Sequence, residues 1–248
     1  MASGPHLTTT RPPDVATPAL RIAVVIPAFN EEESIGHVVG GIPRSHVSET
    51  IVVNNGSTDG TAEVALSSGA TVLTELRRGY GYACLLGIDH AVRSGADIIV
   101  FLDGDFSDYP EELSAILRPI TEEGYDMVIG SRMSGAREPG ALLPQAIFGN
   151  WLAGFLIRMF WGYRFTDLGP FRAVTVEALQ KMRMSDPTYG WTVEMQIKAA
   201  KLKLKCTEVP VRYRRRIGTS KVTGTIPGTI KASTKILFTI FKYLFVGV

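Results

Sequence analysis

The feature that most constrains this chain is an alternation of short apolar runs with segments typical of helices. Residues 22–26, 50–53, 97–102 and 126–129 are largely apolar runs of strand length, and residues 71–73 form a shorter one. Helices are predicted around residues 62–67 and 82–94. Helix starts are predicted at 30–34 and 110–113, where acidic residues and a proline occupy the first turn. Strands that alternate with helices predict βαβ units, and so an α/β fold on a mostly parallel sheet.

Polar residues follow the apolar runs in four places. They occupy positions 27–31, 54–59, 103–105 and 130–132. In sheets of this kind, ligands bind beyond the carboxyl ends of the strands. A chance arrangement of loops is the alternative. Four clusters that recur at one topological position predict a single binding site.

Composition narrows the class of protein. A chain of 248 residues is long enough for one large α/β domain or two small ones. Cys84 and Cys206 cannot form a disulfide framework, and no C-x-x-C spacing suggests zinc. The net charge of +2 is unevenly distributed, since residues 198–242 hold 12 Lys and Arg but only one acid, Glu208. A basic end predicts an anionic partner. Anionic lipid or a phosphate-bearing ligand would suit it. Nucleic acid is not expected, because no known nucleic-acid motif is visible.

Two apolar segments could touch a membrane without crossing it. Neither residues 146–161 nor residues 230–248 contain the ~20 uninterrupted apolar residues needed for a span. They are either core helices or interfacial helices, with aromatic rings at the headgroup level and lysines facing lipid phosphate. We therefore divide the chain into a disordered tail (1–20), a folded domain (21–225) and an apolar or amphipathic, membrane-interfacial segment (226–248).

The strongest chemical signal is Asp103-Gly104-Asp105, directly after the most apolar run. Carboxylates two residues apart in an extended loop can both approach one cation. Oxygen ligands without His or Cys favour Mg²⁺ or Mn²⁺, and such ions often bind substrate phosphates as well. The alternative is a pair of aspartates that cap the next helix.

Several motifs in order resemble the family 2 glycosyltransferases of the GT-A fold. They are Pro27-Ala28-Phe29-Asn30-Glu31-Glu32, Asn54-Asn55-Gly56-Ser57-Thr58-Asp59 and Asp103-Gly104-Asp105. Three later motifs are similar to the polyprenyl-phosphate (dolichyl-phosphate) mannose or glucose synthase branch. They are Gly130-Ser131-Arg132, Asp167-Leu168-Gly169-Pro170-Phe171-Arg172 and Arg215-x-x-Gly218-x-Ser220-Lys221. The resemblance spans residues 21–225. It implies a Rossmann-like central sheet with flanking helices, and we expect a C-terminal amphipathic or apolar helix after it.

The resemblance also implies roles for individual residues. Asp103 and Asp105 would bind the metal and, through it, the donor diphosphate. The nucleotide pocket would be lined by Pro27, Ala28, Asn30 and Glu31, with Asn54 and Asn55 beside the base and ribose. Phosphate, of the donor or of a lipid acceptor, would meet Arg132, Arg215, Ser220 and Lys221.

The chain departs from the family pattern in three places. Asn54 and Asn55 stand where two acids are usual, which leaves UDP or GDP as the nucleotide open. Ser107 replaces a common Gln of the metal motif, so Asp108 or water would supply that oxygen. A Gly-Lys-Gly motif is Gly79-Tyr80-Gly81 here, with Arg77 and Arg78 as substitutes for the positive charge.

The expected activity is metal-dependent, inverting transfer of a hexose from a nucleotide-sugar to a polyprenyl phosphate. The expected location is the cytoplasmic face of a membrane, with peripheral contact. Whether a separate membrane subunit exists stays open. A hydroxyl acceptor would need a carboxylate base, for which Asp167 and Glu194 are the candidates, whereas a phosphate monoester is already largely dianionic. Alternatives are transfer to a soluble or glycan hydroxyl and a sugar-phosphate nucleotidyltransferase. The latter usually has an early basic Gly-rich loop, but residues 27–33 are acidic.

Overall fold

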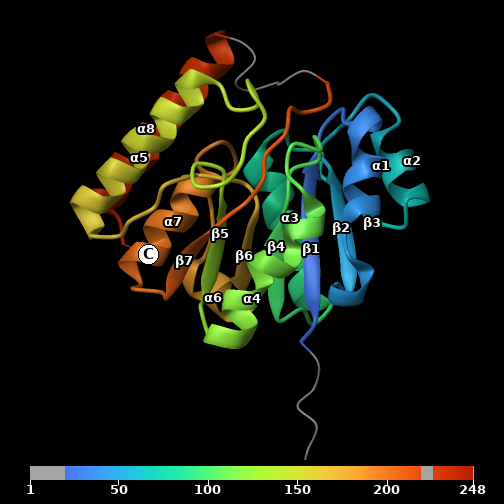
Figure 1. The fold of residues 1–248 in the computed structure, drawn as a ribbon, viewed down its shortest axis with the longest axis horizontal. Helices are drawn as coiled ribbons and strands as arrows, with labels where there is room; N and C mark the ends of the chain where they lie inside the picture. The colour runs from blue at the N-terminus through green and yellow to red at the C-terminus, as the bar shows by residue number, and fades with distance from the viewer. Residues whose placement is uncertain (1–19, 219–225, 248) are drawn as a thin grey trace, which may run out of the picture.

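A mixed sheet forms the centre of the molecule (Figure 1). The computed structural model describes residues 20–218 and 226–247, so most of the predicted tail, Ser220 and Lys221 lie outside the described residues. Within that part of the chain the sheet has seven strands in the order β3-β2-β1-β4-β6-β5-β7. The strands are β1 Ile22–Ala28, β2 Glu49–Asn54, β3 Thr71–Thr74, β4 Ile98–Phe101, β5 Met127–Ser131, β6 Arg172–Thr175 and β7 Cys206–Pro210. All pairs are parallel except those of β6 with β4 and β5. The predicted α/β fold with a mostly parallel sheet is confirmed.

Helices cover both faces of the sheet, because successive strand residues point to opposite sides. On β1, Ile22, Val24 and Ile26 pack with one layer, and Ala23 and Val25 with the other. The first layer contains α1 Glu32–Gly41, α2 Thr61–Ser67 and α4 Leu113–Glu123, the last preceded by a short turn, η2 Pro110–Glu112. The second layer contains α3 Tyr80–Arg93, α6 Val176–Met182 and α7 Trp191–Lys201. A further short turn, η1 Arg44–His46, precedes β2.

Strands β1, β2, β4 and β5 end at the same edge of the sheet. β1 pairs in parallel with both β2 and β4, and β6 is antiparallel to both β4 and β5, which makes β5 parallel to β4. The four polar clusters predicted to converge therefore do so. β1 has β2 on one side and β4 on the other, and this reversal of strand order opens the crevice in which such sheets bind ligands.

Two long helices lie outside the second layer, at the β5–β7 side of the sheet (Figure 1). They are α5 Pro144–Trp161 and α8 Ile226–Phe245, which pack against each other. α8 is anchored at its middle and near its C-terminal end. Lys235 forms an ion pair of 2.7 Å with Asp186, and the Tyr243 hydroxyl donates to Glu194 at 2.6 Å. Among the described residues, no helix has the length and apolar content that crossing a membrane requires.

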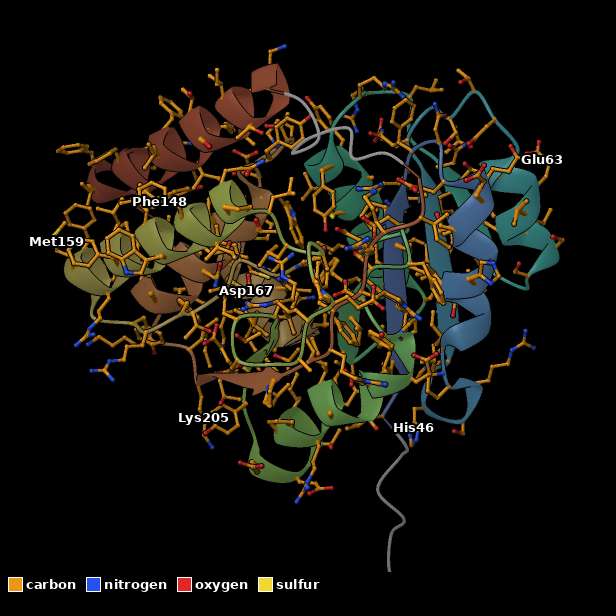
Figure 2. All side chains as sticks on the ribbon, turned by 45° about the horizontal axis from the view of Figure 1, so that its top comes forward. His46, Glu63, Phe148, Met159, Asp167 and Lys205 are labelled. Atoms are coloured by element: carbon orange, nitrogen blue, oxygen red, sulfur yellow. The ribbon has the colours of Figure 1, made fainter. Side chains whose placement is uncertain are left out.

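The outer side of this helix pair is rich in exposed apolar side chains. On α5, Phe148, Trp151, Phe155 and Met159 follow the three- and four-residue spacing of one helix face, and each is half or more exposed. The Trp151 and Phe155 rings stack at 5.8 Å. Figure 2 shows Phe148 and Met159 on the α5–α8 side of the molecule. α8 adds further exposed rings at Phe238, Phe241 and Phe245. We call these seven side chains the aromatic surface.

Candidate active site

Asp103 and Asp105 lie in the loop that follows β4, at the crevice. Asp103 is half-buried, Asp105 is buried, and the Tyr80 hydroxyl donates to Asp103 at 3.1 Å. Burial, and then the negative charge of Asp105, raises the pKa of Asp103 to about 7. Two carboxylates that repel each other in a partly dry site fit a hard cation, because the cation would relieve the repulsion.

A third protein carboxylate does not complete this pair. Within residues 20–218 and 226–247, no group of three or more His, Cys, Asp or Glu is placed to hold a metal ion. Asp108 is buried, and neither of its carboxylate oxygens has a hydrogen-bond partner in that part of the chain. Burial, and then Asp103, raises the pKa of Asp108 well above its usual range. An ion held by Asp103 and Asp105 would therefore take its other ligands from phosphate and water, as Mg²⁺ commonly does.

A cavity of about 410 Å³ opens on one side of the two aspartates. Of the residues predicted to bind the nucleotide, it is lined by Pro27, Ala28, Glu31 and Asn55. Asn30 and Asn54 are not among its lining residues. The Asn30 side-chain oxygen accepts from the Thr58 amide, and that of Asn54 from the Ser57 amide, so both hold the loop after β2. Their roles in nucleotide binding stay predictions.

Asn55 shapes the wall of this first cavity. Its side-chain amide donates to the carbonyls of Glu75 and Arg77 and accepts from the Gly79 amide, which ties the loop before α3 to the end of β2. All of these bonds are to backbone, so a charged Asp here could not replace the two donated bonds. The structure thus gives a physical reason for Asn at a position where an acid is usual.

Of the two arginines predicted to supply positive charge near this loop, only one lines the cavity. Arg78 lies over the Phe29 ring, 3.4 Å from its centre, and donates to the Asn55 and Gly56 carbonyls. Arg77 is largely exposed and pairs with Glu75 at 2.7 Å. Of these two arginines, Arg78 is therefore the one available to a ligand in the first cavity.

Gly79 and Gly81 allow the loop between α6 and α7 to close against α3. A Cβ at Gly79 would overlap the Pro187 carbonyl oxygen, and one at Gly81 would overlap the carbonyl oxygen of Asp186. This contact brings Thr188 and Tyr189 into the wall of the first cavity. The two glycines are therefore needed for close approach of two backbones.

A second cavity, of about 500 Å³, opens on the other side of the aspartates. It shares Tyr80, Asp103, Asp105, Tyr189 and Arg216 with the first cavity. Its basic lining residues are Arg132, Arg215 and Arg216. Its apolar lining comes largely from α5 and the loops on either side of it and from α8, including Leu142, Leu143, Ala146, Leu168, Ala232 and Ile236. Among the described residues that line it, Asp103 and Asp105 are the only carboxylates.

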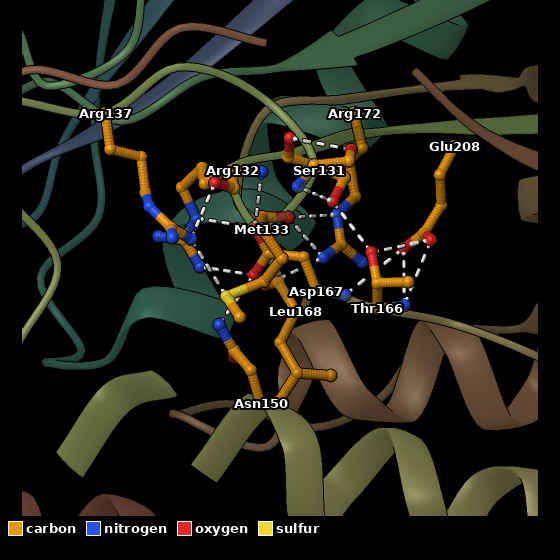
Figure 3. A network of polar contacts seen from close by, with 12 residues as sticks. Ser131, Arg132, Met133, Arg137, Asn150, Thr166, Asp167, Leu168, Arg172 and Glu208 are labelled. Carbon is orange, nitrogen blue, oxygen red and sulfur yellow. Dashed lines mark hydrogen bonds and ion pairs between the residues drawn. The ribbon is translucent and has the colours of Figure 1, made fainter. Parts of the chain in front are cut away.

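Arg132 is held by Asp167 at the edge of the second cavity (Figure 3). Its Nε and Nη2 donate to the two Asp167 oxygens at 2.8 and 2.7 Å, and Asn150 donates to the same carboxylate at 2.8 Å. Burial opposes ionisation of Asp167, but the Arg132 guanidinium holds its pKa below the usual range. Asp167 is therefore a fixed counter-charge. It is not placed to act as a base.

Glu194, the other candidate base, is also fully engaged. It is fully buried and accepts from the backbone amides of Ser185 and Asp186 and from the Tyr243 hydroxyl. Lys198 pairs with it at 3.0 Å. The carboxylate holds α7, α8 and the loop between α6 and α7 together, which is a structural role.

The basic loop after β7 divides into residues that pack and residues that face the cavities. Arg212 pairs with Glu112, and Arg214 lies over the Phe106 ring at 3.4 Å; neither lines a cavity. Arg215 lines the second cavity, and its Nε donates to the Pro139 carbonyl at 2.7 Å. Arg216, which sequence reasoning did not single out, lines both cavities and pairs with Glu31 and Asp105.

A family model described as "Glycosyl transferase family 2" matches residues 23–181 of this chain. The chain belongs to this family. The resemblance proposed from the sequence motifs is thereby confirmed, and the central domain has the GT-A fold. The chain is a family 2 glycosyltransferase.

Relatives and solved structures extend this similarity over most of the chain. The polyprenol monophosphomannose synthase of Mycolicibacterium smegmatis is 30% identical, over 86% of this chain and 85% of that protein. The undecaprenyl-phosphate mannosyltransferase of Micrococcus luteus is 29% identical, over 84% of this chain and 90% of that protein. The glucosyl-3-phosphoglycerate synthase of Mycobacterium tuberculosis, solved with Mn²⁺, UDP-glucose and glycerol 3-phosphate, is 24% identical. It matches with a TM-score of 0.72, over 92% of this chain and 82% of that one.

Proposed function

We propose that this glycosyltransferase transfers a hexose from a nucleotide-sugar to a polyprenyl phosphate. The observation that carries the proposal is the pair Asp103 and Asp105 at the junction of two cavities. A donor in the first cavity and an acceptor in the second would meet at the two carboxylates. An acceptor oxygen would then attack the anomeric carbon from the side opposite the leaving diphosphate, which inverts the configuration at that carbon.

The first cavity suits a nucleotide-sugar diphosphate. Asp103 and Asp105 would hold Mg²⁺ or Mn²⁺, and the ion would act there as a Lewis acid on the leaving diphosphate. Arg78 and Arg216 add positive charge at the wall. A solved structure with the same fold contains Mn²⁺ and UDP-glucose, which supports this assignment.

The second cavity favours a phosphate acceptor over a hydroxyl. A hydroxyl must lose a proton as it attacks, and needs a base. The described lining residues include no carboxylate besides the two that would bind metal, and Asp167 and Glu194 are both engaged elsewhere. Arg132 and Arg215, which line the second cavity and not the first, instead offer cations to an acceptor that is already anionic.

Apolar lining and the aromatic surface support a lipid-linked acceptor. The second cavity runs between α5 and α8, where an isoprenoid chain could leave it against apolar side chains. The same two helices bear the aromatic surface, flanked by the exposed cations Arg158, Lys231 and Lys242. This pattern is typical of peripheral contact with an anionic membrane surface. We place the contact at the cytoplasmic face.

Product analysis tests the proposal directly. The purified protein is incubated with Mn²⁺, a panel of UDP- and GDP-hexoses and a short polyprenyl phosphate, and the products are identified by mass spectrometry. The matched control acceptor is the corresponding free polyprenol. We expect a hexosyl-phosphoryl-polyprenol from the phosphate and no product from the alcohol. Equal or greater transfer to the alcohol would reject the phosphate acceptor.

A further inference from the structure

Arg216 bridges the two sides of the candidate active site. Its Nη1 lies 3.0 Å from an oxygen of Asp105, and its Nη2 lies 3.0 Å from an oxygen of Glu31. Glu31 belongs to the loop after β1 and Asp105 to the loop after β4. A single guanidinium thus joins the wall of the nucleotide cavity to the proposed metal site, and it is exposed to both cavities.

The backbone around Arg216 is fixed beside the metal loop. The Ile217 amide donates to the Asp105 carbonyl at 3.0 Å, and the Arg214 amide donates to that of Ser107 at 2.9 Å. A β-bridge joins Tyr213 to Asp108. The segment therefore runs antiparallel along the metal loop, and these backbone bonds do not depend on the Arg216 side chain.

Both oxygens of Asp105 already have partners. Oδ1 accepts from the amide and the hydroxyl of Ser107, and Oδ2 is paired with Arg216. A divalent ion that binds Asp105 must therefore compete with the guanidinium for Oδ2. The Nε of Arg216 is buried with no partner in the described part of the chain, so the guanidinium does not make all of its hydrogen bonds in this position.

We propose that Arg216 is the counter-cation of the metal site before an ion binds, that a divalent ion displaces it from Asp105, and that the freed guanidinium then contacts the diphosphate of the nucleotide. The inference rests on the proposed function, because it places the diphosphate at Asp103 and Asp105. The planar fork of Arg suits both partners, a carboxylate before the exchange and a phosphate after it.

This exchange couples metal binding to nucleotide binding. Metal alone must break the Arg216–Asp105 pair and leaves the guanidinium without that partner. When metal binds together with a nucleoside diphosphate, the diphosphate becomes a new anionic partner of the Arg216 guanidinium. Each ligand then strengthens the binding of the other by the same factor, as linkage requires.

The test is the substitution Arg216→Gln in the full chain, with UDP and GDP as probes. Free Mn²⁺ is measured by electron paramagnetic resonance without nucleotide, and nucleotide binding by calorimetry at saturating Mn²⁺. We expect Mn²⁺ to bind about tenfold more tightly without nucleotide, and the nucleotide to bind about tenfold more weakly, each a change about as large as one hydrogen bond to a charged group contributes. Arg212→Gln is the matched control, since it makes the same charge change four residues away, outside both cavities. It should change neither affinity.

Mn²⁺ affinity that is unchanged or weaker in Arg216→Gln would overturn the exchange. So would equal changes in Arg212→Gln, which would indicate a general effect of charge. If Arg216→Gln does not fold, Arg216→Lys is measured in the same way and should shift both affinities in the same directions by less. A wild-type protein that binds neither nucleotide at any Mn²⁺ concentration would instead refute the proposed function.

Discussion

Replacing Trp151 by Gln should weaken membrane binding without disturbing the fold. Trp151 is 59% exposed, on the outer face of α5, where it stacks on Phe155. An aromatic side chain presents roughly 200 Å², so about 120 Å² of this one is available to lipid, worth at most about 3 kcal/mol at ~25 cal/mol per Å². That limit corresponds to about 100-fold in the partition coefficient. Because the ring would insert only in part, we expect a loss of about tenfold or more.

The assay is cosedimentation with vesicles that contain anionic lipid, over a range of lipid concentrations. Leu66→Gln is the matched control. Leu66 is 65% exposed on α2, which packs near β3 at the far end of the sheet from α5 and α8 (Figure 1). It should bind vesicles as the wild type does. The reasoning is refuted if Trp151→Gln binds like the wild type, or if Leu66→Gln loses as much.

Three further substitutions test other parts of the structure. Gly81→Ala should destabilise the protein by about 1–3 kcal/mol in urea unfolding, because its Cβ overlaps the backbone of Asp186. The control is Gly40→Ala in α1, where the space around the added Cβ is open, and it should be neutral or stabilising. Glu194→Gln should lower the free energy of unfolding by about 3 kcal/mol at pH 7, since it breaks a buried ion pair. Burial opposes the charge of Glu194, yet the Tyr243 hydroxyl and its other partners hold its pKa below 4.5. The difference in free energy of unfolding between the wild type and Glu194→Gln should therefore be full above pH 4.5 and shrink as the pH falls below it. A difference that does not depend on pH would contradict the assignment. Arg215→Ala should raise KM for the polyprenyl phosphate about tenfold and leave nucleotide affinity unchanged, and a loss of nucleotide affinity alone would reverse that role.

Much of the fold could be predicted because local pattern and topology agree. The apolar run of β1 and the acidic helix start after it are local signals, and parallel strands necessarily bring Asn55 and Asp103 to one edge of the sheet. Strand β6 was not predicted. It is short and antiparallel, and it begins with a charged residue, Arg172, that is fully buried. Arg172 donates to the carbonyls of Leu168 and Gly169 in the preceding loop and of Thr192 in α7, and the sequence pattern of a strand does not reveal these bonds.

Candidate site residues could be predicted where the residue type itself indicates the chemistry. They were missed where their role depends on an ion pair with a distant residue. Asp103 and Asp105 follow from their place after an apolar strand. Arg216 could not be distinguished from Arg212 and Arg214 in a basic run, because each of these has its partner in another part of the chain. One available signal was the number of acids near the crevice, since Glu31 and Asp105 both require counter-charge.

The central claim is that Asp103 and Asp105 hold a hard cation which neutralises the leaving diphosphate. Calorimetric titration of UDP and GDP into wild-type protein and Asp105→Asn, with and without Mn²⁺, tests it most directly. We predict nucleotide binding that depends on Mn²⁺ in the wild type, and a loss of that dependence in Asp105→Asn, with melting temperatures that confirm both are folded. Binding to Asp105→Asn that Mn²⁺ strengthens as much as in the wild type would contradict the account.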